Sequence, residues 1–244
     1  MKTIVVLTAA LAAGALMTAK ADILADWTFE TAASTNNIIG AGDTPGATQS
    51  GILADIGTGT ASGSHASSAT AWSIPAGNGS AHSWSANTWA LGDYYQFSVS
   101  LDLVDNTYSG INVTYDQNGS ATGPKTYHIA YSTDGSSFTQ LGSDYGLTSG
   151  VTWSSGTPNQ PTQLSDDFSS IIALDSASTI YFRIVDDSAT TGGAINGGNV
   201  GTAGTDRIDN FVVNATITPV PEPSSLALAA MGGAACLVAF RRKR

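Results

Sequence analysis

The sequence predicts an all-β protein, a jelly-roll-like antiparallel β-sandwich flanked by two terminal targeting segments. Apolar residues alternate with polar ones over several short runs, Gly-, Ser- and Asn-rich turns separate the runs, and no credible long helix lies between the ends. An N-terminal signal-peptide helix and a C-terminal transmembrane helix complete the predicted architecture. An immunoglobulin-like sandwich and a β-solenoid are the alternatives, and the absence of a fixed-period repeat disfavours the solenoid.

The first 21 residues are typical of a secretory signal peptide. Lys2 precedes an apolar run over residues 4–17, and Ala19-Lys20-Ala21 forms a small-x-small cleavage site. We therefore expect export by Sec-type machinery and cleavage by signal peptidase between Ala21 and Asp22. An uncut N-terminal membrane anchor is the alternative interpretation.

Residues 22–218 are predicted to form one β-sandwich domain. A first strand is expected near residues 23–30. Alternation predicts further strands over residues 95–103, 111–115, 126–133, 136–141 and 180–185. Asp134-Gly135 predicts a two-residue hairpin turn between two of these runs.

In the remaining parts of the domain, the alternation of apolar and polar residues is less regular. A last strand is expected over residues 207–217, where the apolar phase slips and indicates a β-bulge at Asp209-Asn210. Residues 36–83 contain few apolar anchors, so we expect only one or two strands and a surface loop there.

Composition excludes several classes of protein. Charged residues make up only 11% of the chain, which excludes a coiled coil and charge-driven disorder. Between residues 22 and 218, the three cations Lys125, Arg183 and Arg207 stand against eighteen acids, a net charge of −15 that argues against nucleic-acid binding. Cys236 is the sole cysteine, so neither an intramolecular disulfide nor a cysteine zinc site can form.

The C-terminal 26 residues combine three features in a defined order. Pro221-Glu222-Pro223 comes first and an uncharged apolar run follows over residues 226–240. The chain ends in the basic cluster Arg241, Arg242, Lys243 and Arg244. The apolar run is shorter than the ~20 residues that span a bilayer, so we expect a weak membrane anchor with its basic end in the cytoplasm.

This order resembles the PEP-CTERM sorting signal of exported proteins in Gram-negative bacteria, with residues 219–244 as the sorting segment. The resemblance implies recognition and cleavage by an exosortase. It also implies a transient membrane anchor followed by a place at the cell surface or in the extracellular matrix. Members of this family are commonly associated with exopolysaccharide, and some carry ice-binding domains.

Two acids suggest a structural Ca²⁺ site. Glu30 ends the predicted first strand and Asp209 lies in the last one, an arrangement similar to carbohydrate-binding jelly rolls that hold calcium with acids at such positions. Ca²⁺ prefers several carboxylate and carbonyl oxygens and would reduce repulsion in an acidic domain. In the alternative, Asp209 pairs with Arg207 or caps the bulge, and Glu30 is solvated. Further candidate ligands are Asp186, Asp187 and Asp206.

Trp72 and Trp84 lie in an otherwise polar region and are candidate ligand-binding residues. Sugar faces stack on exposed indole rings, while neighbouring Asn and Asp side chains bond the hydroxyl groups. Core packing between two sheets is the alternative for both rings, and Trp89 is expected to be a core residue.

No catalytic constellation is present in the sequence. Neither a His-Glu-x-x-His motif, a Gly-x-Ser-x-Gly elbow nor a Walker loop occurs, and His65, His82 and His128 are scattered. We therefore expect a non-catalytic surface or matrix protein that associates with exopolysaccharide. A carbohydrate-active hydrolase or lyase on the same fold is the alternative. Ice binding is a third option, which the irregular spacing of Thr disfavours.

Overall fold

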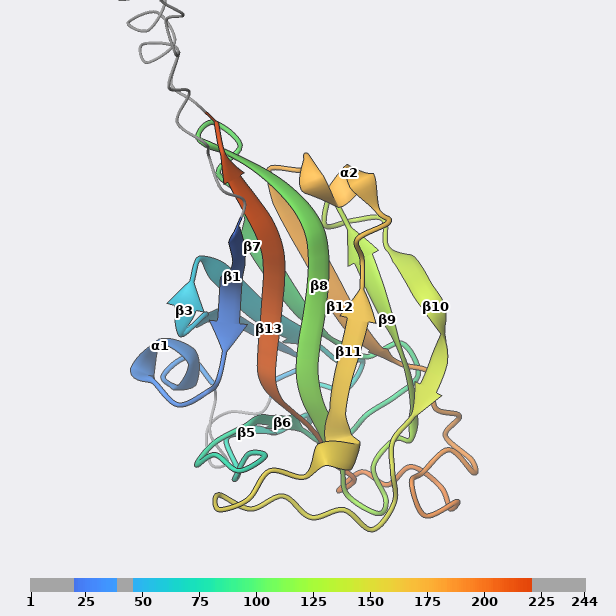
Figure 1. Cartoon of the computed structure of the whole chain (residues 1–244). Helices are drawn as coiled ribbons and strands as arrows, with labels where there is room; N and C mark the ends of the chain where they lie inside the picture. The colour runs from blue at the N-terminus through green and yellow to red at the C-terminus, as the bar shows by residue number, and fades with distance from the viewer. Residues whose placement is uncertain (1–19, 39–45, 221–244) are drawn as a thin grey trace, which may run out of the picture.

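The computed structural model describes residues 20–38 and 46–220, which form two antiparallel β-sheets packed against each other (Figure 1). The predicted antiparallel β-sandwich is therefore confirmed. The predicted signal-peptide helix and the predicted C-terminal membrane helix lie outside the described residues.

The first sheet has seven strands in the order β11-β8-β13-β1-β3, with β6 paired to β13 and β5 paired to β6. Its front face is seen in Figure 1, where β13 runs between β1 and β8. The strands are β1 (Lys20–Trp27), β3 (Ile56–Gly57), β5 (Trp72–Ser73), β6 (Trp84–Ala86), β8 (Asn106–Gly119), β11 (Gln163–Asp167) and β13 (Asp206–Pro219).

The second sheet has six strands in the order β10-β9-β12-β7-β4-β2. They are β2 (Thr48–Leu53), β4 (Gly59–Ser64), β7 (Tyr94–Ser100), β9 (Thr126–Ser132), β10 (Thr139–Gly146) and β12 (Thr179–Asp186). The helical elements of the described residues are single turns: α1 (Ala32–Thr35), η1 (Gln160–Thr162) and α2 (Ile172–Asp175).

The bulge predicted in the last strand is confirmed. The register between β13 and β8 shifts between Asp209 and Val212, and Asn210 adopts a positive φ of 49°. An extra residue in one strand turns the following side chains relative to the sheet. The bulge thus allows Ile208 and Phe211, three positions apart, to be buried in the same core.

The hairpin around Asp134 forms, but its turn is longer than the two residues predicted. Thr139 pairs with Tyr131 and β9 ends at Ser132, so the connection runs over residues 133–138. The Asp134 carboxylate accepts hydrogen bonds of 2.8 Å from the backbone N–H groups of Ser136 and Ser137. These side-chain bonds replace the ladder bonds that a two-residue turn would need.

The region from 36 to 83 contains more strand than the sequence predicts, because glycine and alanine occupy inward positions. Within it lie β2, β3, β4 and β5, and in β4 the buried positions are Ala61 and Gly63. A Cβ atom at Gly63 would lie 2.2 Å from the Trp72 ring. The bulky side chain comes from the opposite sheet, so β4 itself has no apolar alternation to detect.

The core between the sheets is aromatic. Phe97 of β7 stacks on Phe211 of β13 with ring centroids 3.6 Å apart and an interplanar angle of 6°. Trp27 of β1 meets both rings edge-on, at 5.1 and 6.0 Å. Aromatic pairs contribute free energy beyond the burial of their area, so this cluster ties the two sheets together.

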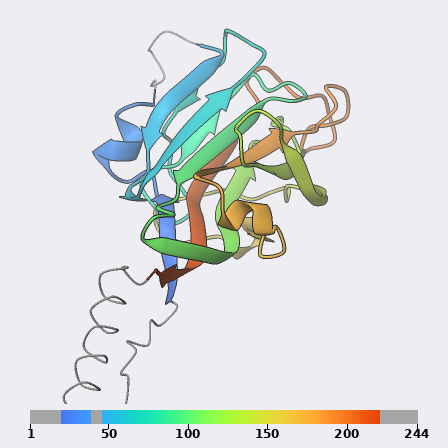
Figure 2. The same ribbon diagram turned by 90° about the horizontal axis from the view of Figure 1, so that it is seen from above.

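The first and last strands leave the sandwich side by side (Figure 2). Lys20 pairs with Ile217 and Ala21 with Thr216. The predicted signal cleavage after Ala21 therefore falls inside β1. Residue 219, where the predicted sorting segment begins, lies at this same end of the domain.

We predict that Phe211→Ala lowers the free energy of unfolding by about 3–5 kcal/mol, because it removes a fully buried ring from the stack with Phe97. Chemical denaturation measures the change. Val104→Ala is the control, since that side chain is 83% exposed and its loss should change stability by less than about 0.5 kcal/mol. Equal effects of both substitutions would contradict the proposed role of the stack.

Candidate functional site

A pocket of about 420 Å³ opens where β8 ends and β13 begins. Its walls come from segments far apart in the sequence: the end of β8 and the loop after it, residues 149–153, residues 195–196 and the start of β13. The polar and apolar groups that define it are Asn118, Ser120, Trp153, Ile195, Asn196 and Arg207. The volume lies within the range of roughly 300–1,000 Å³ typical of small-ligand sites.

Backbone contacts bring these segments together. Arg207 pairs with Asn118 across the β13–β8 ladder. Beyond the ladder, the Ser120 hydroxyl accepts a 2.8 Å bond from the Thr205 N–H, and the Asn196 N–H donates to the Ala121 carbonyl at 2.9 Å. The walls from β8, β13 and residues 195–196 are therefore fixed by main-chain bonds at the end of a sheet rather than by side chains alone.

The pocket combines polar donors with an apolar wall. Arg207 Nη1 donates to the Ala76 carbonyl at 3.4 Å, and Asn196 Oδ1 accepts from the Gly198 N–H at 2.8 Å. The Asn196 amide nitrogen has no partner among the described residues and is free to donate. Trp153 is buried, and its Nε1 donates to Thr162 Oγ1 at 2.9 Å, so its ring supplies apolar wall.

The two predicted calcium ligands bind the same loop segment. Asp209 Oδ2 accepts bonds of 2.8 Å from the Asn78 N–H and 2.7 Å from Ser80 Oγ. Glu30 Oε1 accepts a 2.6 Å bond from the His82 N–H. Burial raises the pKa of Asp209 to about 7, and the bonds from Ser80 and Asn78 oppose that shift. In this arrangement both acids anchor residues 78–82, and calcium at this position stays a prediction.

Trp72 and Trp84 are core residues in the structure, the second of the two alternatives open from the sequence. They are 1% and 0% exposed, and their rings stack with centroids 5.4 Å apart. Trp72 Nε1 donates to the Gly46 carbonyl at 2.9 Å. In this conformation neither ring offers a face on which a sugar could stack. Trp89 is also buried, as expected.

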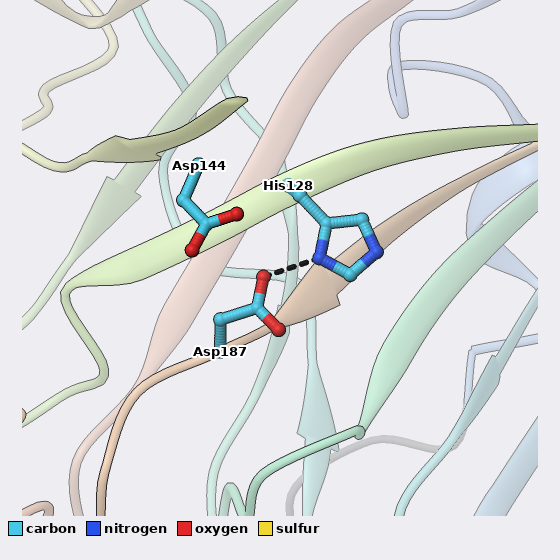
Figure 3. A group of neighbouring side chains, drawn as sticks. All are labelled: His128, Asp144 and Asp187. Carbon is cyan, nitrogen blue, oxygen red and sulfur yellow. Dashed lines mark hydrogen bonds and ion pairs between the residues drawn. The ribbon is translucent and has the colours of Figure 1, made fainter. Parts of the chain in front are cut away.

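His128, Asp144 and Asp187 come together on the outer side of the six-stranded sheet (Figure 3). One potential ligand atom of each lies within 4.8 Å of the others. His128 Nδ1 contacts the Asp187 carboxylate directly, and Asp144 Oδ1 accepts a 2.8 Å bond from Gln140 Nε2. The cluster is a surface-accessible His–Asp pair with a second acid beside it. Sequence spacing does not reveal it, because His128 lies in β9, Asp144 in β10 and Asp187 directly after β12.

The other two candidate ligands named from the sequence, Asp186 and Asp206, are buried. Burial raises the pKa of Asp206 well above its usual value, while Gln117 Nε2 donates to both of its oxygens at 3.2 and 3.3 Å. Asp186 Oδ1 accepts from the Ser188 N–H at 2.8 Å, and its Oδ2 is buried with no partner. The structure separates these two from Glu30 and Asp209 by placing them in other hydrogen-bond networks.

Residues 219–244 match the PEP-CTERM protein-sorting motif. The chain carries a PEP-CTERM sorting motif. This motif implies export, a C-terminal membrane anchor before cleavage, and processing by an exosortase. No helix among the described residues is both long and apolar enough to cross a membrane, and the motif itself lies beyond them except for its first two residues.

No curated protein matches the chain. Among solved structures, the K1 cleaved adhesin domain of Lys-gingipain from Porphyromonas gingivalis W83 is similar at 16% identity and a TM-score of 0.35, over 80% of this chain and 97% of that one. The K3 cleaved adhesin domain of the same protein is similar at 15% identity and 0.34, over 57% and 76%. TmCBM61, solved in complex with β-1,4-galactotriose, is similar at 13% identity and 0.31, over 64% and 86%.

The pocket itself is not predictable from the sequence. The sequence singles out Arg207 as one of three cations and as an alternative partner of Asp209, and no pattern connects it with Asn118 or Asn196. The available signal was general: Asn- and Gly-rich segments between strands are where binding residues concentrate.

The buried acids predict a pH dependence of stability. Burial raises the pKa of Asp186 to about 7, and the charges of Asp93 and Asp187 raise it further, against the bonds from Ser188. The folded protein therefore holds this proton at pH values where the unfolded chain has lost it, so stability falls as pH rises from about 4 to 7. We expect Asp186→Asn to reduce this pH-dependent loss in the free energy of unfolding by on the order of 2–4 kcal/mol at pH 8.

Thermal melts between pH 4 and pH 8 measure the effect, with Asp105→Asn as the control for removing an exposed acid. A pH profile of Asp186→Asn that parallels the wild-type profile would contradict this assignment.

Proposed function

We propose that the protein is an exported, exosortase-processed and non-catalytic component of the cell surface or extracellular matrix. In this proposal, the β-sandwich associates with exopolysaccharide through the pocket around Arg207. The sorting motif supports export and processing, and the pocket is the observation that carries the binding role.

The position of the pocket supports this role. Arg207 lies near the start of β13 and residue 219 ends it, and the twelve intervening steps of extended chain span about 40 Å. The pocket therefore opens at the end of the sandwich opposite to the start of the sorting segment. While the C-terminal segment holds the protein at the membrane, the pocket is directed away from the attachment point.

The chemistry of the pocket suits an uncharged sugar. Sugar rings present hydroxyl groups along their edges and apolar C–H groups on their faces, and a binding site must satisfy both. The guanidinium of Arg207 and the free amide nitrogen of Asn196 provide donors, and Trp153 and Ile195 provide apolar surface. Main-chain bonds hold the segments of Arg207, Ile195 and Asn196, and the bond to Thr162 holds the Trp153 ring, before any ligand arrives, which lowers the entropy cost of binding.

The pocket also supports a binding role rather than hydrolysis. Glycoside hydrolysis requires two carboxyl groups on either side of the scissile bond. None of the residues that line the pocket is Asp, Glu or His. Incubation with a glycan array followed by an assay of reducing ends tests this directly. Binding without turnover supports the proposal, and turnover would replace it with the hydrolase or lyase alternative.

We predict that Arg207→Ala weakens binding to the array glycans by about tenfold, because a hydrogen bond from a charged group contributes roughly 1.5–3 kcal/mol. Isothermal titration calorimetry with the best array ligand measures the loss. Lys125→Ala is the matched control, since it removes the same charge from an exposed side chain that does not line the pocket. Equal binding by wild type and Arg207→Ala would exclude the pocket as the site.

We predict that Glu222→Ala blocks processing, so that the uncleaved chain accumulates in the membrane fraction. Glu222 lies within the matched sorting motif, and the proposal assigns recognition by the exosortase to that motif. Fractionation and mass spectrometry of the C-terminus measure the outcome. Thr218→Ala, just outside the matched segment, is the control, and release of the Glu222→Ala chain at the wild-type level would refute the prediction.

A further inference from the structure

Arg183 presents its side chain on the outer face of the six-stranded sheet. Its neighbours in β12, Phe182 and Ile184, are fully buried in the core, and alternation along a strand places the residue between them on the opposite face. The register pairs Arg183 with Gln96 of β7 on one side and with Ala130 of β9 on the other. The residue therefore lies in the middle of the sheet, away from its edges.

Two aromatic rings hold the guanidinium group of Arg183. The Tyr94 ring centroid lies 3.9 Å from Cζ, and the Phe138 ring centroid lies 3.6 Å from it. The Nε–H donates to Gln96 Oε1 at 2.8 Å. Each ring attracts the cation through its electron-rich face, and the bond to Gln96 fixes the rotation of the plane. We refer to Tyr94, Gln96, Phe138 and Arg183 as the arginine clamp.

The clamp leaves the end of the guanidinium group unused. Neither terminal nitrogen of Arg183 has a hydrogen-bond partner among the described residues, and neither is among the buried unpaired atoms. Both nitrogens are therefore accessible from outside the protein. No described carboxylate forms an ion pair with Arg183, although acids outnumber cations heavily in this domain. The nearest acid along the hairpin that carries Phe138 is Asp134, and its carboxylate is already bonded to Ser136, Ser137 and Ser132.

We propose that the arginine clamp binds the carboxylate of a sugar acid within an anionic polysaccharide. The two terminal nitrogens form a planar fork whose N–H groups match the two oxygens of a carboxylate. Because the rings and Gln96 already hold the fork in place, little side-chain freedom is lost when the carboxylate binds.

The groups beside the fork favour a sugar over an acidic peptide. The Gln96 amide nitrogen and the Tyr94 hydroxyl have no hydrogen-bond partner among the residues the structure describes. They offer hydrogen bonds to ring hydroxyls next to the carboxylate. The choice of a polysaccharide as the occupant rests on the proposed function, and the clamp adds to it a second site with a different chemical preference from the pocket around Arg207.

The acidity of the domain does not prevent this binding. Repulsion between the polyanion and distant acids is screened over about 8 Å at physiological ionic strength. Along the same face of the sheet, Asp187 lies four residues from Arg183, a separation of about 13 Å in extended chain. The fork is thus a local positive site that an anionic chain can reach between acids.

The test uses the protein purified after export and polygalacturonate as the probe, with its methyl ester as the uncharged counterpart. Affinity electrophoresis measures the dissociation constants. We expect the wild type to bind polygalacturonate and to bind the methyl ester at least about tenfold more weakly. Arg183→Lys keeps the charge but loses the fork, and we expect it to lose about tenfold in affinity, whereas Lys125→Ala should bind as the wild type does.

The inference would be overturned by no binding of polygalacturonate by the wild type, by equal binding by Arg183→Lys, or by equal binding of the methyl ester. Binding of polyglutamate at the same strength would assign the clamp to acidic peptides and would overturn the sugar assignment. If Arg183→Lys fails to fold in a thermal melt, Phe138→Leu replaces it. That variant keeps Arg183 and removes one wall of the clamp, and it too should weaken binding.

The result can be separated from the proposed function by Arg207→Ala. Loss of array-glycan binding in Arg207→Ala, together with unchanged polygalacturonate binding, would support two independent sites. Binding of array glycans by a wild type that ignores polygalacturonate would refute the clamp and leave the proposed function standing.

Discussion

The domain depends on the pairing of its last strand with its first. β13 lies between β1 and β8; it pairs with β8 from Asp206 to Pro219 and with β1 from Phe211 to Ile217. Phe211 projects from it onto Phe97, so the same strand that joins the ends of the chain also joins the two sheets. Contacts between residues this far apart in sequence form only after loop-closure entropy has been overcome, and the aromatic core supplies the compensating free energy.

The bulge in β13 connects this packing to the surface. Before the bulge, Arg207 lines the pocket. At the bulge, the buried Asp209 carboxylate binds the segment from Asn78 to Ser80. After the bulge, Phe211 packs in the core. A regular strand would place alternate residues on fixed faces over its whole length. The extra residue allows one strand to serve core, loop anchor and pocket within five positions.

The scarcity of cations explains how the acids are used. With three cations between residues 22 and 218, acids take backbone N–H and hydroxyl groups as partners. Asp55, for example, accepts bonds from the N–H groups of Thr28 and Phe29 at 2.8 and 2.9 Å, and its pKa is lowered by such bonds against the effect of burial. None of these three cations forms an ion pair with an acid among the described residues. Arg183 differs from the other two because two rings and Gln96 hold its guanidinium group with both terminal nitrogens free, and a planar fork held in this way matches an external carboxylate.

Much of the fold and the presence of the sorting motif were determined by the sequence. Period-two alternation identified β7, β8, β9 and β12, and the slip after Ile208 identified the bulge, because both are local patterns. The sorting motif is also local, and it was read from the order of its three parts. β4 escaped because its buried positions are Ala61 and Gly63, and because Gly59 and Gly63 lie under Trp27 and Trp72 of the opposite sheet. Only the tertiary structure decided that Trp72 and Trp84 are core, that Glu30 and Asp209 meet on one loop, and that Arg207 joins Asn118 and Asn196 in a pocket. Those outcomes depend on which distant segments become neighbours. The period of a strand specifies on which side of the sheet a side chain lies, but it does not specify which residues that side chain contacts.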